Sequence, residues 1–145
     1  MSISSSPAAR ALPIIAIVGM SDRADRPSYD VGRYMQAQGY RIVPVNPMCA
    51  GKLILGEQCY DSLASASAAL LVSGECISIV DCFRKAADIP PVVEDAINIG
   101  ASCVWMQLGI EHAQAAERAR AAGLIVVMDK CIKIEHAAGH LHGVL

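Results

Sequence analysis

The sequence predicts a single α/β domain built on a doubly wound parallel sheet, and three observations carry this prediction. Short continuous runs of aliphatic and β-branched residues recur along the chain, as expected of strands that are buried on both faces. The segments between these runs place apolar residues at the i, i+3, i+4 spacing of amphipathic helices. The chain has 145 residues, of which 54% are apolar, and this is enough for one well-buried core.

Five strands are expected, because five runs of four or five residues are mainly aliphatic or β-branched. They are residues 14–18, 41–45, 77–80, 103–106 and 124–128. Helices are expected between them, at residues 28–38, 61–71, 90–99 and 111–122, and the tail from Asp129 should add one more short helix. Three of the helical segments are followed by a glycine, which supplies the left-handed residue with which many helices end: Gly39, Gly100 and Gly123.

Strands and helices that alternate through short turns form right-handed crossovers in a parallel sheet. Among the strand orders of this class we expect 3-2-1-4-5, a Rossmann-like arrangement. Such sheets bind ligands beyond the carboxyl ends of the strands, where the strand order reverses. The expected order places this point between the first and fourth strands. Residues 1–12 are expected to form a flexible N-terminal arm ahead of a domain that spans 13–145.

Composition disfavours several classes of partner. Twelve Lys and Arg stand against 14 Asp and Glu, so the net charge of −2 gives no attraction to nucleic acid or to an anionic membrane. The longest apolar run, 14–20, is far shorter than the roughly 20 residues of a spanning helix. The leader lacks the apolar stretch of a signal peptide. We therefore expect a cytoplasmic protein that binds neither nucleic acid nor membrane.

The six cysteines form no C-x-x-C pair, a spacing that fits neither a zinc site nor a disulfide framework. Reduced thiols are expected instead. His136 and His140 have the i, i+4 spacing of a helical metal pair, but no third ligand is evident, so we predict no metal site.

The loop after the first strand is the first candidate binding segment. Gly19 lets a ligand approach the backbone, Ser28 is a candidate helix N-cap, and Arg23 and Arg26 could meet phosphate oxygens. An ordinary loop with solvated arginines explains the same residues equally well, so phosphate binding stays open on this loop alone.

Two common nucleotide sites are disfavoured. The dinucleotide fingerprint G-x-G-x-x-G lacks its second glycine, because Ser21 stands there. No acidic residue ends the second strand, and none occurs before Glu57. The only Gly-Lys step is Gly51-Lys52-Leu53, which is not a P-loop.

Several segments together resemble a known family. They include Ile17-Val18-Gly19-Met20-Ser21, Gly39-Tyr40-Arg41-Ile42-Val43-Pro44-Val45-Asn46-Pro47, Ile79-Val80-Asp81-Cys82-Phe83-Arg84 and Met128-Asp129-Lys130-Cys131-Ile132. Over about residues 12 to 141 the chain resembles the small CoA-binding domain family, which is related to the N-terminal domain of the succinyl-CoA synthetase α subunit.

The resemblance implies a Rossmann-like CoA-binding domain and assigns residues to parts of the ligand. Gly19 and Ser21 would face the pyrophosphate, Val45, Asn46 and Pro47 would border the ribose, and Asp81, Cys82, Phe83 and Arg84 would flank the adenine. The chain departs from the synthetase relatives after the second strand, where Met48 and Cys49 replace their lysine. Candidates for the 3′-phosphate contact are therefore Lys52, Arg26 and Arg41.

Four further residues carry two interpretations each. Gln107 ends the fourth strand and could bind an amide of the pantetheine arm, whereas Trp105 fits the core better. Phe83 could line an adenine or simply pack. Cys131 follows Lys130, which could lower its pKa and allow a mixed disulfide with the CoA thiol, but most such cysteines are only small apolar residues.

The sequence thus predicts a protein that binds CoA or an acyl-CoA and has no complete catalytic constellation of its own. One alternative is a subunit of an acyl-CoA ligase with a separately encoded partner. Another is a regulatory module that responds to NAD(P) or another nucleotide in the same crevice. A protein partner is open under each of these interpretations.

Overall fold

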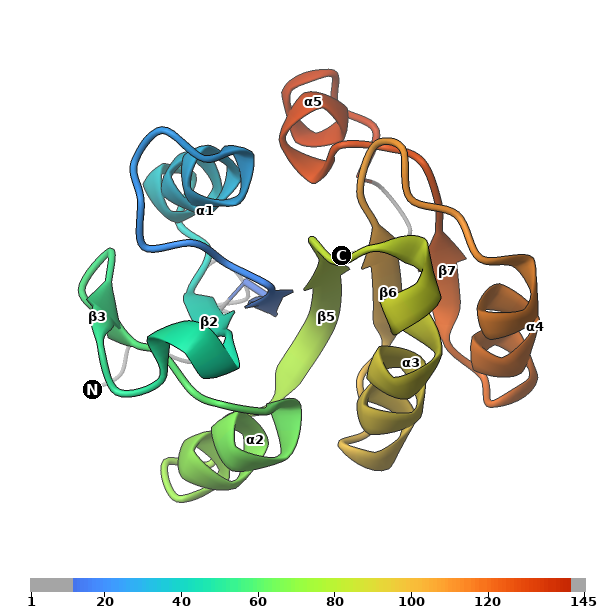
Figure 1. Ribbon diagram of the computed structural model, residues 1–145, viewed down its shortest axis with the longest axis horizontal. Coiled ribbons are helices and arrows are strands. Elements are labelled where there is room, and N and C mark those ends of the chain that lie inside the picture. The colour runs from blue at the N-terminus through green and yellow to red at the C-terminus, as the bar shows by residue number, and fades with distance from the viewer. Residues whose placement is uncertain (1–11, 142–145) are drawn as a thin grey trace, which may run out of the picture.

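A computed structural model describes residues 12–141, in which a five-stranded parallel sheet carries helices on both faces (Figure 1). The order across the sheet is β2-β1-β5-β6-β7. These strands are β1 (Ile14–Val18), β2 (Ile42–Val45), β5 (Ile77–Cys82), β6 (Cys103–Met106) and β7 (Ile125–Val127). The predicted α/β, doubly wound, Rossmann-like class is confirmed.

The helices divide the core into two layers. On one face lie α1 (Pro27–Ala37) and α5 (Ile132–Ala137), and on the other lie α2 (Leu63–Leu71), α3 (Ile89–Asn98) and α4 (Ala113–Ala121) (Figure 1). The apolar side chains follow this division, because Val31, Met35 and Ile132 pack with one cluster and Leu63 and Val93 with the other. Alternate residues of each strand enter opposite clusters, as the pleat requires.

A short segment between β2 and α2 was not expected. It contains a 3-10 helix, η3 (Pro47–Cys49), and an antiparallel hairpin of β3 (Leu53–Ile54) and β4 (Glu57–Gln58). After the hairpin, Tyr60 forms a one-residue parallel bridge with Val45. A second 3-10 helix, η4 (Ala86–Asp88), precedes α3.

The observed order is consistent with the 3-2-1-4-5 pattern, with one reassignment. The place beyond β2 belongs to the Tyr60 bridge, whereas the strand expected there, 77–80, is β5 and pairs with β1. The strand order therefore reverses between β1 and β5. The fourth strand of the expectation was 103–106, which is β6. The expected reversal between β1 and β6 is wrong, because β5 lies between them.

Most of the predicted N-terminal arm, residues 1–11, lies outside the described residues, so the boundary at 12/13 stays a prediction. None of the helices within 12–141 has the length and apolar character that crossing a bilayer requires.

Candidate functional site

A cavity of about 260 Å³ lies at the carboxyl edge of the sheet, where the strand order reverses. The ends of β1 and β2, the loop after β5, the first turn of α2 and the first two turns of α3 line it. Its lining is Val18, Gly19, Val45, Pro47, Asp61, Ser62, Leu63, Arg84, Asp88, Pro91, Val92 and Asp95.

Gly19 joins three strand ends at this edge. Its N–H donates to the Val45 carbonyl at 2.7 Å, while the Phe83 N–H donates to the Val18 carbonyl at 2.8 Å. Gly19 has a φ of +87°, and an added Cβ would stand 2.4 Å from the Phe83 carbonyl oxygen. Glycine is therefore required here both by conformation and by space.

The loop after β1 is closed by its own hydrogen bonds. The Ser21 N–H donates to Ser28 Oγ at 2.9 Å, and the Arg23 N–H donates to Ser21 Oγ at 3.0 Å. Ser28 was expected to be the N-cap of α1, but this is wrong. Pro27 begins the helix, Arg26 is the N-cap, and Ser28 is a buried residue of the first turn. The amide of Ser21 is consequently engaged within the protein.

The residues expected beside the ribose divide into two roles. Val45 and Pro47 line the cavity. Asn46 instead fastens the edge, since its Nδ2 donates to the Met20 carbonyl at 3.0 Å and its Oδ1 accepts from the Met48 N–H at 3.0 Å. The end of β2 is thereby held against the loop after β1.

Two of the expected cations lie at this edge. Arg84 lines the cavity, and its guanidinium is 3.5 Å from a carboxylate oxygen of Asp88. Lys52 reaches from the hairpin to the loop after β1, where its Nζ is 3.3 Å from the Asp22 carboxylate, and its side chain is 61% exposed. An ammonium so placed can turn toward a phosphate without unpacking the core.

Arg41 does not line the cavity, so the structure gives no support to its expected contact with a 3′-phosphate. It precedes β2 and so stands at the amino edge of the sheet, where it pairs with Glu75 at 2.6 Å and Glu57 at 3.4 Å. Hydrogen bonds and charge attraction from these carboxylates raise its pKa despite desolvation, the largest single influence, which lowers it. The expected strand at 41–45 already placed Arg41 at its amino end, whereas ligands of such sheets bind at the carboxyl ends, so the strand prediction itself argued against this candidate.

Three carboxylates line the cavity that no sequence pattern indicated: Asp61, Asp88 and Asp95. Asp61 accepts a hydrogen bond from Ser65 Oγ at 2.8 Å, and Ser62 caps α2 by accepting from the Ser65 N–H at 3.1 Å. The Asp-Ser step before an apolar run is a signal for a helix start. It could not show that this start lies beside β2, which depends on the Tyr60 bridge.

The segment after β5 differs most from expectation. The strand continues to Cys82, so Asp81 and Cys82 are part of the sheet and fully buried, and neither lines the cavity. Burial raises the pKa of Asp81 well above its ordinary value and also raises that of the Cys82 thiol. Phe83 is half-buried and packs on the α1/α5 face, and only Arg84 of the four residues lines the cavity.

Gln107 and Trp105 anchor the segment before α5. Trp105 Nε1 donates to the Lys130 carbonyl at 2.7 Å, and Gln107 Oε1 accepts from the Ile132 N–H at 3.2 Å. Gln107 is 4% exposed and follows β6, so it does not stand beside the reversal point as expected. Trp105 is part of the core, as its second interpretation had it.

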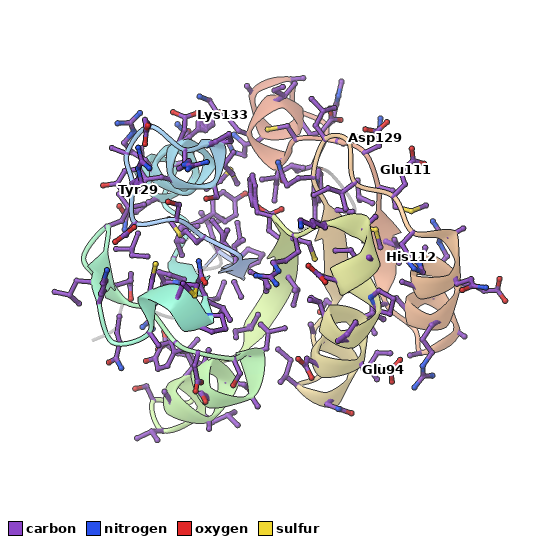
Figure 2. All side chains as sticks on the ribbon, viewed as in Figure 1. Tyr29, Glu94, Glu111, His112, Asp129 and Lys133 are labelled. Atoms are coloured by element: carbon purple, nitrogen blue, oxygen red, sulfur yellow. The ribbon has the colours of Figure 1, made fainter. Side chains whose placement is uncertain are left out.

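The same segment contains Asp129 with a φ of +58°, whose Oδ1 accepts from the Gly109 N–H at 2.7 Å. Figure 2 shows Glu111 and Asp129 in the loops after β6 and β7, and Tyr29 and Lys133 on α1 and α5. Cys131 is the half-buried N-cap of α5.

The histidines of the tail serve the packing of α5. His136 Nδ1 lies 2.8 Å from Tyr34 Oη, and His140 Nδ1 lies 3.2 Å from a carboxylate oxygen of Glu135. No group of three or more His, Cys, Asp or Glu side chains within 12–141 is arranged to hold a metal ion.

Comparison with known proteins gives one family. The family described as CoA binding domain matches residues 14–137. The uncharacterized protein YneT of Bacillus subtilis (strain 168) is 38% identical over 123 residues, which are 85% of this chain and 84% of that protein. The structure of cell-free ID.343 from Thermus thermophilus is 32% identical, with a TM-score of 0.77 over 87% of this chain and 89% of its own.

The fold also occurs within a larger enzyme. The apo form of dinucleotide-forming acetyl-coenzyme A synthetase 1 from Ca. Korarchaeum cryptofilum matches 80% of this chain and 26% of its own, with 17% identity and a TM-score of 0.64. This likeness concerns the fold alone.

Proposed function

The chain belongs to the CoA binding domain family, and on this premise we propose that it is a cytosolic protein that holds CoA or an acyl-CoA at the carboxyl edge of its sheet. The cavity beside the Gly19 turn, where the strand order reverses, is the observation that carries the proposal. Parallel α/β sheets bind their ligands at this point. The proposed activity is binding, with no catalytic step.

The diphosphate of the ligand would lie beside the loop after β1. Gly19 brings the backbone to the edge of the cavity, and α1 begins just beyond the loop with Pro27. The first turn of a helix leaves N–H groups without intrahelical partners, and its dipole favours negative charge. Arg26, the exposed N-cap residue, adds a cation at the same place.

The adenosine would lie in the cavity itself. Val45, Pro47 and Val92 offer apolar contact, while the carboxylates of Asp61 and Asp95 can accept hydrogen bonds from ribose hydroxyls or an amino group. Three carboxylates against the single arginine of the lining make this space unfavourable for a phosphate.

The 3′-phosphate would therefore stand outside the cavity, next to Lys52. This lysine immediately precedes the β3–β4 hairpin, just after Met48 and Cys49, where the chain departs from the synthetase relatives. Its partner Asp22 lies on the diphosphate loop. An exposed pair of this kind holds its geometry weakly, so that exchange of Asp22 for phosphate is inexpensive.

A thermal-shift series tests the proposal, since a ligand that binds the native state raises its melting temperature. CoA and acetyl-CoA should shift the midpoint, 3′-dephospho-CoA should shift it less, and NAD and NADP should have no effect. A shift by the nicotinamide nucleotides with none by CoA would reject the proposal.

One observation favours a second candidate, a module that responds to NAD(P) or another nucleotide. Sequence reasoning set NAD aside because no acidic residue follows the second strand before Glu57. The Tyr60 bridge nevertheless brings Asp61 to the end of β2, where a carboxylate can hold the ribose hydroxyls of a dinucleotide. The thermal-shift series separates the two candidates, because only the second expects NAD to stabilise the fold.

A further inference from the structure

Asp81 is the least explained side chain of the described residues. It is 0% exposed, and neither of its carboxyl oxygens has a hydrogen-bond partner within 12–141. Leaving a buried polar group unsatisfied is costly, whereas an apolar side chain of the same shape would avoid that cost. Packing alone therefore does not account for an acid at this position.

The sheet register shows where this carboxyl lies. Asp81 is paired with Ile17 on β1 and with Trp105 on β6. Ile17, Trp105 and Phe83 all belong to the apolar cluster on the α1/α5 face. Because side chains alternate along a strand, Asp81 shares this face and lies one row below Phe83, which is half-buried at the carboxyl edge.

A second polar group occupies the edge row of the same face. Gln107 is two residues beyond Trp105, and its hydrogen bond to the Ile132 N–H uses only Oε1. No hydrogen bond within 12–141 uses its Nε2, and this nitrogen is not among the buried atoms that lack a partner, so it keeps contact with the surface although the residue as a whole is 4% exposed. A buried acid without a partner and an accessible amide donor thus lie on neighbouring rows beside Phe83.

We propose that Asp81 and Gln107 form a subsite that binds a carbonyl oxygen of the ligand's pantetheine or acyl arm, reached when the Phe83 side chain moves aside. This inference rests on the proposed function. It places the arm on the α1/α5 face, opposite the cavity that would hold the adenosine.

The chemistry of the two groups fits a neutral carbonyl. Burial raises the pKa of Asp81 well above its ordinary value and so favours the protonated carboxyl, which has an O–H to donate. Gln107 Nε2 is also a donor. Two neutral hydrogen-bond donors suit the amide carbonyls of pantetheine or the carbonyl of a thioester. A phosphate would be bound better by a cation.

The test compares two substitutions of similar shape. Asp81→Leu removes every polar atom, and Asp81→Asn keeps a donor. Calorimetric titration would use CoA, acetyl-CoA and adenosine 3′,5′-bisphosphate, the last of which carries no arm. Asp81→Leu should lower the affinity for CoA about tenfold or more, as the loss of a buried hydrogen bond implies, and leave the affinity for the bisphosphate unchanged. The affinity of Asp81→Asn for CoA should stay near that of wild type.

The melting temperature distinguishes a binding role of Asp81 from a purely structural one. Asp81→Leu should melt at a higher temperature than wild type without ligand, because it removes an unsatisfied group, while its affinity for CoA falls. A greater loss for acetyl-CoA than for CoA would assign the subsite to the thioester, and an equal loss would assign it to an amide.

Unchanged CoA affinity in Asp81→Leu would overturn the subsite, and so would an equal loss for CoA and the bisphosphate. Either result leaves the proposed function standing if wild type binds CoA. Failure of wild-type protein to bind CoA would instead reject the proposed function, and the subsite with it.

Discussion

Replacing Gly19 by alanine tests how the carboxyl edge is assembled. A side chain at a φ of +87° costs about 1 kcal/mol for the left-handed backbone. The new Cβ would also stand 2.4 Å from the Phe83 carbonyl oxygen, a backbone atom, and crowding of this kind costs about 1–3 kcal/mol. The free energy of unfolding should fall by about 2–4 kcal/mol, which for a domain of this size lowers Tm by about 6–16 °C.

Gly100→Ala is the matched control. Its φ is +76°, but nothing lies within 4 Å of the added Cβ, so only the backbone cost of about 1 kcal/mol applies. Urea and thermal denaturation of both variants give the two free energies, and their difference isolates the crowding at Phe83. Equal losses would refute the inference that Gly19 is required for close approach of the β1 and β5 ends. Under the proposed function, Gly19→Ala should also lose the thermal shift by CoA.

Three further predictions concern ionisable side chains. In calorimetric titration, Lys52→Ala should lower the affinity for CoA by about two- to fivefold and leave the affinity for 3′-dephospho-CoA unchanged. Equal losses of affinity for both ligands would show that Lys52 does not contact the 3′-phosphate. Arg41→Ala should leave CoA affinity unchanged in the same titration, because this side chain pairs with Glu57 and Glu75 at the amino edge, and a CoA-specific loss would contradict that placement. As pH rises above about 4, Asp81 ionises in the unfolded chain, whereas its raised pKa in the folded protein opposes ionisation there. Up to the folded pKa, the free energy of unfolding of wild type should therefore fall relative to that of Asp81→Asn by up to about 1.4 kcal/mol per pH unit. Urea denaturation between about pH 5 and pH 7 measures this difference, and parallel pH profiles would show that the buried carboxyl is satisfied.

The elements that sequence predicted best are those with local signals. β1 and β6 begin and end where the aliphatic runs do, at Ile14–Val18 and Cys103–Met106. A run that is buried on both faces has an apolar residue at every position, so its limits are visible without knowledge of its neighbours. The start of α1 was missed by one residue because Pro27, not Ser28, sets it.

What sequence did not predict depends on contacts between distant segments. The position of β5 beside β1 follows from the direction of a crossover, which the residues of β5 do not encode locally. The same holds for Asp61, which reaches the cavity only because Tyr60 pairs with Val45. The polar ending of β5 also misled prediction, since Asp81 and Cys82 look like loop residues and are buried strand.

Under the proposed function, the sheet explains why a long ligand would suit this edge. Asp95 lies in the cavity on the α2/α3 side, whereas Asp81 lies on the α1/α5 side, so the strands stand between them. A compact nucleotide can reach only one of these faces. A molecule with a nucleotide at one end and a long arm can reach both by crossing the strand ends at Gly19, the residue whose missing side chain leaves backbone at that crossing. Comparing CoA with adenosine 3′,5′-bisphosphate therefore separates the two faces by the length of the ligand, independently of its charge.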